Sequence, residues 1–269
     1  MAIYDIEGNE LNSAYSIDSS FLPQAYDIEG YELLSTIKIL EYNVGNFSQG
    51  GTTGYSGNDL AGYMSDWISF ISSCNSDVCL FTESRKYVDS SNTTLSANGI
   101  YSNVYSNVLG YYPSTNWGAV LLSNASQSDT KTVKFTNQSS SESKYVGAMI
   151  NLKGVNVYVV SVHFIHGGTE NATIRTAQMN ELITALSSYD NVIIGGDFNT
   201  HVLTELSTLQ SAGFTFANDG VSTFSVSDPT LPLDNVGVRG NKLSIQSFNV
   251  LSDVTLSDHM PTITEILVG

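Results

Sequence analysis

A short run in the second half of the chain offers the clearest chemistry. Val192, Ile193 and Ile194 are three β-branched apolar residues, typical of a short buried strand, and two glycines then interrupt the run. Asp197 and Asn199 follow, two positions apart, where such a strand leaves the core. A carboxylate there can accept a proton or hold a metal ion, and an amide can donate to an anion. An Asx turn after a core strand would give the same pattern, so other segments must decide.

Further polar side chains stand at the ends of other apolar runs. They are Asn43, Glu83, His163, Asp234, Asp258 and His259. Each has an ordinary explanation in isolation, such as a solvated strand end, a hydrogen-bonded core histidine or a turn before a proline. Because ligand sites in α/β folds gather at the carboxyl ends of strands, their joint occurrence predicts one shared site.

The composition limits the partners of the chain. Its 269 residues carry 26 acidic side chains against 10 Lys plus Arg, which gives a net charge of −16, and 41% apolar residues are enough for a substantial core. Such a surface repels nucleic acid at long range, which argues against tight sequence-independent DNA binding through a basic stripe. A phosphate substrate would need a divalent cation or a local cluster of bases to bring it in.

Targeting signals and cysteines are scarce. No run of about 18 apolar residues exists, so no transmembrane segment is expected. Residues 1–11 are acidic and do not form a secretory signal as written, so we expect a cytoplasmic protein or a part of a virus particle or surface assembly. Cys74 and Cys79 have neither zinc spacing nor a disulfide framework, and we expect two reduced thiols, with a local disulfide as the alternative.

The first 35 residues carry an 11-residue pattern three times, beginning at Tyr4, Tyr15 and Tyr26. Each copy alternates aromatic and aliphatic residues with acids. A unit this short cannot bury its own apolar face and must stack on something. We therefore predict that residues 1–35 are an attachment or oligomerisation module, which contacts an assembly partner or other copies of the chain. A flexible acidic leader is the alternative.

From residue 36 to residue 269 the pattern is that of one domain in which strands alternate with helices. Strands are predicted at residues 37–44, 77–83, 116–122, 131–135, 145–152, 155–164, 192–194, 234–238, 244–250 and 262–267. Helices are predicted after a capping residue at Asp59, at residues 174–186 and, as a short one, at residues 202–212. The polar, tyrosine-rich segment 90–114 is expected to be a surface loop. These elements predict an α/β fold with two sheets packed face to face and helices outside.

Six motifs occur in a fixed order along this domain. They are Tyr42-Asn43-Val44, Thr82-Glu83, Ser161-Val162-His163, Gly196-Asp197-Phe198-Asn199, Leu233-Asp234 and Ser257-Asp258-His259-Met260-Pro261. In this order they resemble the endonuclease/exonuclease/phosphatase superfamily, the DNase I-like fold. The resemblance covers residues 36–268 and implies a four-layer α/β sandwich, with two packed mixed β-sheets flanked by helices.

The resemblance also implies a metal site and a hydrolytic role for the central motif. Glu83 would be the main Mg²⁺ ligand, with Mn²⁺ or Ca²⁺ as alternatives, and Asn43 and Asp258 would complete the metal shell. Asp197 would orient or deprotonate the attacking water. Asn199 would hold a phosphate oxygen or the nucleophile.

The resemblance to the family also implies roles for the histidines. His259 would bind the scissile phosphate or transfer a proton, and Asp234 would fix its tautomer through the other ring nitrogen. His163 matches the second histidine of the nuclease-like and sphingomyelinase-like branches. His166 and His201 match no motif and are expected to be loop residues.

Two departures from the family pattern bear on the metal site. Thr82 stands where the family usually has a glutamine, and the acid that some branches carry two positions after Asn43 is missing, which weakens the expectation of a second metal ion. Arg85 and Arg175 are candidate contacts for the substrate phosphate, with solvated surface charge as the alternative.

The expected function is that of a Mg²⁺-dependent phosphoesterase, and specifically a nuclease that cleaves phosphodiester bonds of DNA or RNA by metal-assisted attack of water. One alternative is a phosphatase or a sphingomyelinase-like phosphodiesterase that acts on a small or lipid-linked phosphate, with the tyrosine-rich loop 101–112 as an apolar lip. The other is a structural or attachment component of a larger assembly, for example a virus particle, built on this fold.

Overall fold

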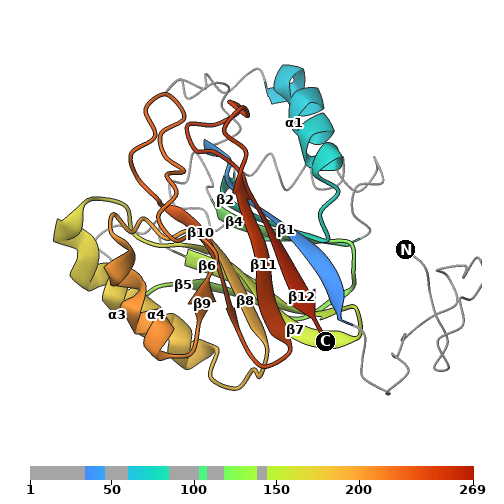
Figure 1. The fold of residues 1–269 in the computed structure, drawn as a ribbon, viewed down its shortest axis with the longest axis vertical. Coiled ribbons are helices and arrows are strands. Elements are labelled where there is room, and N and C mark those ends of the chain that lie inside the picture. The colour runs from blue at the N-terminus through green and yellow to red at the C-terminus, as the bar shows by residue number, and fades with distance from the viewer. Residues whose placement is uncertain (1–33, 46–59, 85–102, 108–117, 138–143) are drawn as a thin grey trace, which may run out of the picture. The chain divides into compact units, whose positions relative to one another are not determined.

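The computed structural model describes residues 34–45, 60–84, 103–107, 118–137 and 144–269 (Figure 1). The three repeats, Asp59, Arg85 and most of segment 90–114 lie outside these ranges. In chain order the main elements are β1 (Ser35–Asn43), α1 (Leu60–Cys74), β2 (Val78–Ser84), β3 (Asn103–Asn107), β4 (Gly118–Ser123), β5 (Gln127–Lys134), β6 (Lys144–Leu152), β7 (Val155–His163), η2 (Thr169–Asn171), α3 (Ala172–Ala185), β8 (Val192–Asp197), η3 (Leu203–Leu206), α4 (Ser207–Ser211), β9 (Thr215–Phe216), β10 (Asp234–Arg239), β11 (Leu243–Val250) and β12 (Thr262–Val268).

The strands form two six-stranded mixed sheets, with the orders β11-β12-β1-β2-β4-β3 and β5-β6-β7-β8-β10-β9. Near the centre of each sheet lies a parallel pair, β1 with β2 in the first and β7 with β8 in the second. The neighbouring strands of both pairs run antiparallel to them. The first sheet therefore contains the first and the last strand of the described domain, and the second sheet contains strands from the middle of the chain.

Alternate residues of the central strands face opposite layers, as the two-residue period of a strand requires. On β1, Ile37 and Ile39 belong to the core between the two sheets, whereas Leu40 and Tyr42 belong to the outer core. The strand β7 divides its residues in the same way. Because both faces of β7 are buried, it reads in the sequence as a nearly continuous apolar run.

Helices close the two outer faces (Figure 1). The α1 helix packs Trp67 and Ile71 against the first sheet. The second sheet is covered by α3 and α4, through Met179, Leu182 and Leu209. The predicted helix–sheet–sheet–helix sandwich is thereby confirmed.

The structure adds two strands that the sequence pattern did not predict. Residues 103–107 form β3 on the edge of the first sheet, where the expectation was a surface loop. That expectation was wrong because pairing with β4 satisfies the backbone of a polar segment, which side-chain pattern does not reveal. The other new strand, β9, has two residues, which is too short for any periodicity.

Two further expectations concern cysteines and membrane spans. Cys74 and Cys79 form no disulfide, and Cys79 is buried. In the described part of the chain no helix has the length and apolar character needed to cross a membrane.

Candidate active site

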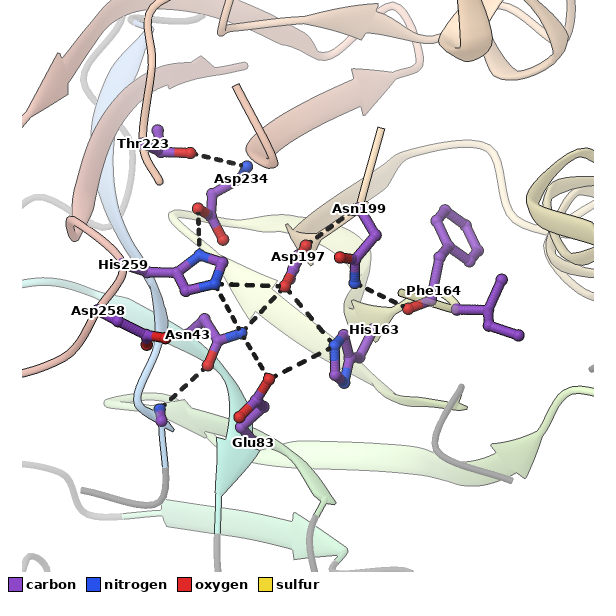
Figure 2. A network of polar contacts seen from close by, with 12 residues as sticks. Asn43, Glu83, His163, Phe164, Asp197, Asn199, Thr223, Asp234, Asp258 and His259 are labelled. Carbon is purple, nitrogen blue, oxygen red and sulfur yellow. Dashed lines mark hydrogen bonds and ion pairs between the residues drawn. The ribbon is translucent and has the colours of Figure 1, made fainter. Parts of the chain in front are cut away.

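Strand register brings the polar strand ends together. His163 at the end of β7 lies directly opposite Asp197 at the end of β8, and Asp234 at the start of β10 lies opposite Asp197 on its other side. In the first sheet Asn43 ends β1 opposite Thr82, the residue before Glu83. One end of the sandwich therefore collects side chains from both sheets (Figure 2).

Close approach of β7 to β8 explains the glycine before Asp197. Gly196 has φ +142°, and a Cβ atom built there would lie 2.0 Å from the carbonyl oxygen of Val162. Any side chain at Gly196 would push the two strands apart, so the position is restricted to glycine. The glycine thus keeps Asp197 next to His163.

Two of the site residues, Glu83 and Asn199, have left-handed backbone conformations, with φ of 52° and 51°. Asparagine adopts this region more readily than most residues, but for glutamate it is uncommon. Glu83 also lies where the β2–β4 register shifts, between Phe81 and Ser84, and such bulges re-aim side chains. Strained backbone of this kind concentrates at functional sites.

The amide of Asn43 lies at the centre of a polar network (Figure 2). Its Nδ2 donates to Asp197 Oδ2 at 3.0 Å and to Glu83 Oε1 at 3.1 Å, and it lies 3.3 Å from His259 Nε2. Its Oδ1 accepts a hydrogen bond from the backbone N–H of Gly45. His163 Nε2 lies 3.6 Å from Asp197 Oδ2 and 4.0 Å from Glu83 Oε1.

Asp197 and His259 are each fixed by a second contact. The other oxygen of Asp197 accepts the backbone N–H of Asn199 at 2.8 Å. His259 Nδ1 lies 2.7 Å from Asp234 Oδ2, so its Nε2 is turned toward Asp197 at 3.8 Å. Asn199 donates from Nδ2 to the Phe164 carbonyl at 3.0 Å, which ties the β8 end to the loop after β7.

Burial gives the acid and the base unusual proton affinities. It raises the pKa of the Asp197 carboxyl to about 7, although the nearby His259 opposes this shift. Burial disfavours the imidazolium of His259, but the charge and hydrogen bond of Asp234 outweigh it and raise the pKa of His259 to about 10. Burial and the charge of Asp234 also raise the pKa of Glu41, which lies beneath the site, well above its usual range.

These shifts predict a pH dependence of stability in the metal-free protein. Asp197 ionises near pH 4 in the unfolded chain but keeps its proton up to about pH 7 in the folded protein. His259 loses its proton near pH 6.5 in the unfolded chain but keeps it up to about pH 10 in the folded protein. Since the folded state binds more protons in both windows, both groups make stability fall as pH rises. The expected loss is on the order of a few kcal/mol for each group.

The measurement is urea unfolding in EDTA at pH 5, 7 and 9, for wild type and Asp197→Asn. The stability of wild type relative to Asp197→Asn should decrease between pH 5 and 7. A relative stability that stays level or rises over this interval would contradict the assignment of the raised pKa to Asp197.

The network opens into a cavity of about 470 Å³. Its polar lining includes Asn199 and the three acids Glu83, Asp197 and Asp258, and Phe224, Leu231 and Leu233 supply an apolar part. The rest of the lining includes His163, His166, His201 and His259, which are all four histidines of the chain. His166 and His201 lie in loops, as expected, but their place in the cavity lining was not predicted.

The fold of the chain is similar to the folds of known structures. An endonuclease/exonuclease/phosphatase protein from Beutenbergia cavernae DSM 12333 matches with a TM-score of 0.69 and 15% identity, over 87% of this chain and 72% of that one. The chain has the endonuclease/exonuclease/phosphatase fold. The DNase I-like architecture inferred from the six motifs is thus confirmed.

Two other structures with the endonuclease/exonuclease/phosphatase fold carry bound molecules. The human nocturnin catalytic domain, solved with a sulfate anion, has a TM-score of 0.68 and 17% identity over 89% of this chain and 97% of that one. TDP2 from D. rerio, in complex with a single-strand DNA product, has a TM-score of 0.66 and 14% identity over 86% and 99%. No protein-family model and no curated protein matches the sequence.

Within this endonuclease/exonuclease/phosphatase fold, Arg175 has a different place from the one expected. It is fully buried, and its guanidinium pairs with Glu205 at 2.7 Å and donates to the carbonyls of Gly167 at 2.8 Å and Gly168 at 3.0 Å. A side chain enclosed in this way does not reach a substrate, so the expectation of a phosphate contact was wrong. Arg175 instead holds the loop after β7. Arg85 lies outside the described residues.

Replacing Arg175 with methionine should destabilise the domain strongly. It would leave the Glu205 carboxylate buried without its partner and remove donors from two carbonyls, which typically costs about 3–5 kcal/mol. Urea unfolding measures the loss. The double variant Arg175→Met/Glu205→Gln should recover part of it, and a single variant as stable as wild type would contradict the structural role.

Two groups of side chains could hold a metal ion in the described residues. The potential ligand atoms of Glu83, His163 and Asp197 lie within 4.8 Å of one another, as do those of Asp197, Asp234 and His259. Beside the first group, Nδ2 of Asn43 donates to the carboxylates of both Glu83 and Asp197. These two carboxylates lie close to one another and require positive charge between them. Carboxylate oxygens suit a hard divalent cation, so these residues fit one.

The acid of the last motif is placed less closely. Asp258 lines the same cavity, and its Oδ1 accepts a hydrogen bond from Ser257 Oγ at 3.2 Å. Among the described residues, neither of the two metal-binding groups includes it. Its role as a metal ligand remains a prediction.

Proposed function

We propose that this chain is a Mg²⁺-dependent phosphoesterase that hydrolyses phosphodiester bonds of nucleic acid. The observation that carries the proposal is the pairing of a buried carboxylate, Asp197, with an oriented imidazole, His259, in the cavity that also holds Glu83. Hydrolysis of a phosphate ester requires a base, an acid and a metal ligand close together. Asp197, His259 and Glu83 can fill these three roles in one cavity.

The side chains divide the reaction between them. Water attacks phosphorus, Asp197 takes a proton from this water, and the bond from phosphorus to the ester oxygen breaks. Because the pKa of Asp197 is about 7, its carboxylate is available near neutral pH and is also a competent base. The imidazolium of His259, held by Asp234, stabilises the negative charge on the phosphate oxygens and can return a proton to the leaving oxygen.

Glu83 would hold the divalent cation, and Asp258 and the Oδ1 of Asn43 would complete the set, while Asp197 stays available as the base. When bound, the cation supplies charge stabilisation at the phosphate oxygens and lowers the pKa of a bound water. Mg²⁺ is proposed because it prefers carboxylate and carbonyl oxygens, with Mn²⁺ and Ca²⁺ as substitutes to test.

Nucleic acid is proposed as the substrate because of the structures that share this fold. TDP2 was solved with a single-strand DNA product, and nocturnin with a sulfate, which has the shape and charge of a phosphate. The net charge of −16 argues for a weakly held strand and for recognition inside the cavity rather than over a broad surface.

The test is a panel of plasmid DNA, RNA, sphingomyelin and a phosphomonoester, each with Mg²⁺ or EDTA. We expect Mg²⁺-dependent cleavage of DNA or RNA that disappears in Asp197→Ala. Turnover of sphingomyelin or of the monoester alone would move the protein to the lipid or small-phosphate alternative. Without metal-dependent turnover of any substrate, the enzyme proposal fails and the structural alternative stands.

We also propose that residues 1–35 attach the domain to a partner or to other copies of the chain. The three 11-residue repeats support this proposal. Deleting residues 1–34 and measuring the mass in solution tests it. An unchanged mass and an unchanged partner set would count against the module.

A further inference from the structure

The four histidines of the chain divide into an inner and an outer pair around one cavity. His163 and His259 are buried and belong to the network around Asp197. His166 is exposed and His201 is half-buried. Both lie in the loops that follow the strand ends, and both line the same cavity. The proposed hydrolysis uses His259 of the inner pair and neither histidine of the outer pair, so the outer pair needs its own explanation.

Strand order places the outer pair on loops that follow neighbouring strands. His166 follows β7 by three residues, and His201 follows β8 by four. Since β7 and β8 are parallel neighbours that end in register at His163 and Asp197, both loops leave the sheet at the same edge. The outer histidines therefore share one cavity with the reaction centre.

The loops that carry the outer pair are anchored to one another by buried groups. Arg175 bonds the carbonyls on the His166 loop and pairs with Glu205, which lies on η3, just after His201. The side chain of Asn171 donates to the His166 carbonyl at 2.7 Å. Gly167 has φ +104°, and a Cβ atom there would lie 2.5 Å from Asn171 Nδ2. Such anchoring holds a binding surface in place before the ligand arrives.

Charge selects the kind of ligand. The cavity lining includes no Lys or Arg among the residues that the structure describes, so the imidazoles are its basic groups. The three acids of the lining, Glu83, Asp197 and Asp258, are those assigned to the metal ion and to proton transfer, so an anion that enters beside them would be bound by the imidazoles of the outer pair. Glu170 lies near His201, but its carboxylate already accepts the backbone N–H of Gly168 at 2.8 Å.

The cavity is also larger than one phosphate requires. A phosphate of five heavy atoms fills on the order of 100 Å³, judged from about 30 Å³ for a water molecule. The volume of about 470 Å³ leaves space for a second group beyond the one held by the inner pair. In a nucleic-acid strand the next anionic group is the neighbouring phosphate.

We propose that His166 and His201 form a second phosphate-binding subsite, which takes the phosphate next to the scissile one. This inference rests on the proposed phosphodiesterase function and makes it more specific: the substrate class is a strand with at least two consecutive phosphates. The outer pair determines specificity and has no part in the bond-breaking step.

Kinetics on two substrates provide the first test. One is an oligonucleotide, and the other is the p-nitrophenyl ester of thymidine 5′-monophosphate, which has a single phosphodiester. In His166→Gln/His201→Gln, the ratio of kcat/KM for the oligonucleotide to that for the ester should fall about 10-fold to 100-fold, mainly through a higher KM. The exposed Lys153→Gln, at the opposite end of β7, removes a positive charge elsewhere and should leave the ratio unchanged.

Binding without turnover provides the second test and separates the two proposals. In an Asp197→Asn background with Mg²⁺, thymidine 3′,5′-bisphosphate should bind at least about 10-fold more tightly than thymidine 5′-monophosphate, and the two histidine substitutions should remove this difference. Equal loss on both kinetic substrates, or no bisphosphate preference, overturns the subsite even if the enzyme cleaves DNA. A preference that depends on the histidines supports the subsite even if no substrate is turned over.

Discussion

Replacing Asp197 with asparagine is expected to lower kcat for a phosphodiester by about 10³-fold, with little change in KM. Asparagine keeps the size of the side chain and can still accept the backbone N–H of Asn199, but it cannot take a proton from water. The expected effect is large because general-base catalysis contributes about 10²-fold to 10⁴-fold. Steady-state kinetics in saturating Mg²⁺ measure it.

The matched control is Asp190→Asn. Asp190 is exposed and lies two residues before the first residue of β8, whereas Asp197 is the last residue of that strand. This substitution removes the same negative charge from the same segment without touching the cavity, and activity should remain at the wild-type level. If Asp197→Asn retained more than about a tenth of wild-type kcat, Asp197 would not be the base.

Glu83→Gln is expected to produce the second large effect, a loss of metal binding. The substitution keeps the shape of the side chain but removes the carboxylate charge from the cluster with Asp197 and His163. We expect divalent-metal affinity to fall by at least about 100-fold, because even partners of metal ligands contribute 10-fold to 100-fold. Calorimetric titration with Mg²⁺ and Mn²⁺ measures the affinity directly.

Thermal unfolding gives an independent readout of the same change. A metal that binds only the folded state raises the unfolding temperature of wild type, and Glu83→Gln should respond far less. Glu265→Gln is the control, since Glu265 lies on β12 and bonds Ser247 outside the cavity. A Glu83→Gln protein with wild-type metal affinity would show that the ion binds elsewhere.

Most of the architecture was predictable because the core is built from strands with long apolar runs. The sequence marks β1, β2, β7 and β8 clearly, since both of their faces are buried. The two-residue β9 is too short for any periodicity, and the polar β3 is held by backbone pairing with β4 that its side chains do not reveal, so neither could be predicted.

The candidate site shows the same division between local and nonlocal information. Asp197 and Asn199 carry a local signal, a glycine turn after a buried strand. The contact of Asn43 with Asp197 spans 154 residues, and it could be expected only because ligand sites gather at strand ends and because the motifs resemble those of a known family. The sequence could not show that Arg175 is buried, because a charged residue on a helix usually faces solvent. The lining role of His166 and His201 did have a signal, since each follows a motif residue within a few positions.

The contacts of Asn43 and His259 have a consequence for engineering this protein. Asn43 and Glu83 extend from the first sheet and Asp197 and Asp234 from the second, so the hydrogen bonds that define the site cross the seam between the sheets. The seam is tight there: a Cβ atom at Gly195 would lie 2.5 Å from Leu80 Cδ1. A larger side chain at the seam would separate the sheets and pull the proton acceptor away from the metal ligands. Thermostabilising substitutions are therefore safer under the outer helices, and turnover becomes a sensitive gauge of how far apart the two sheets lie.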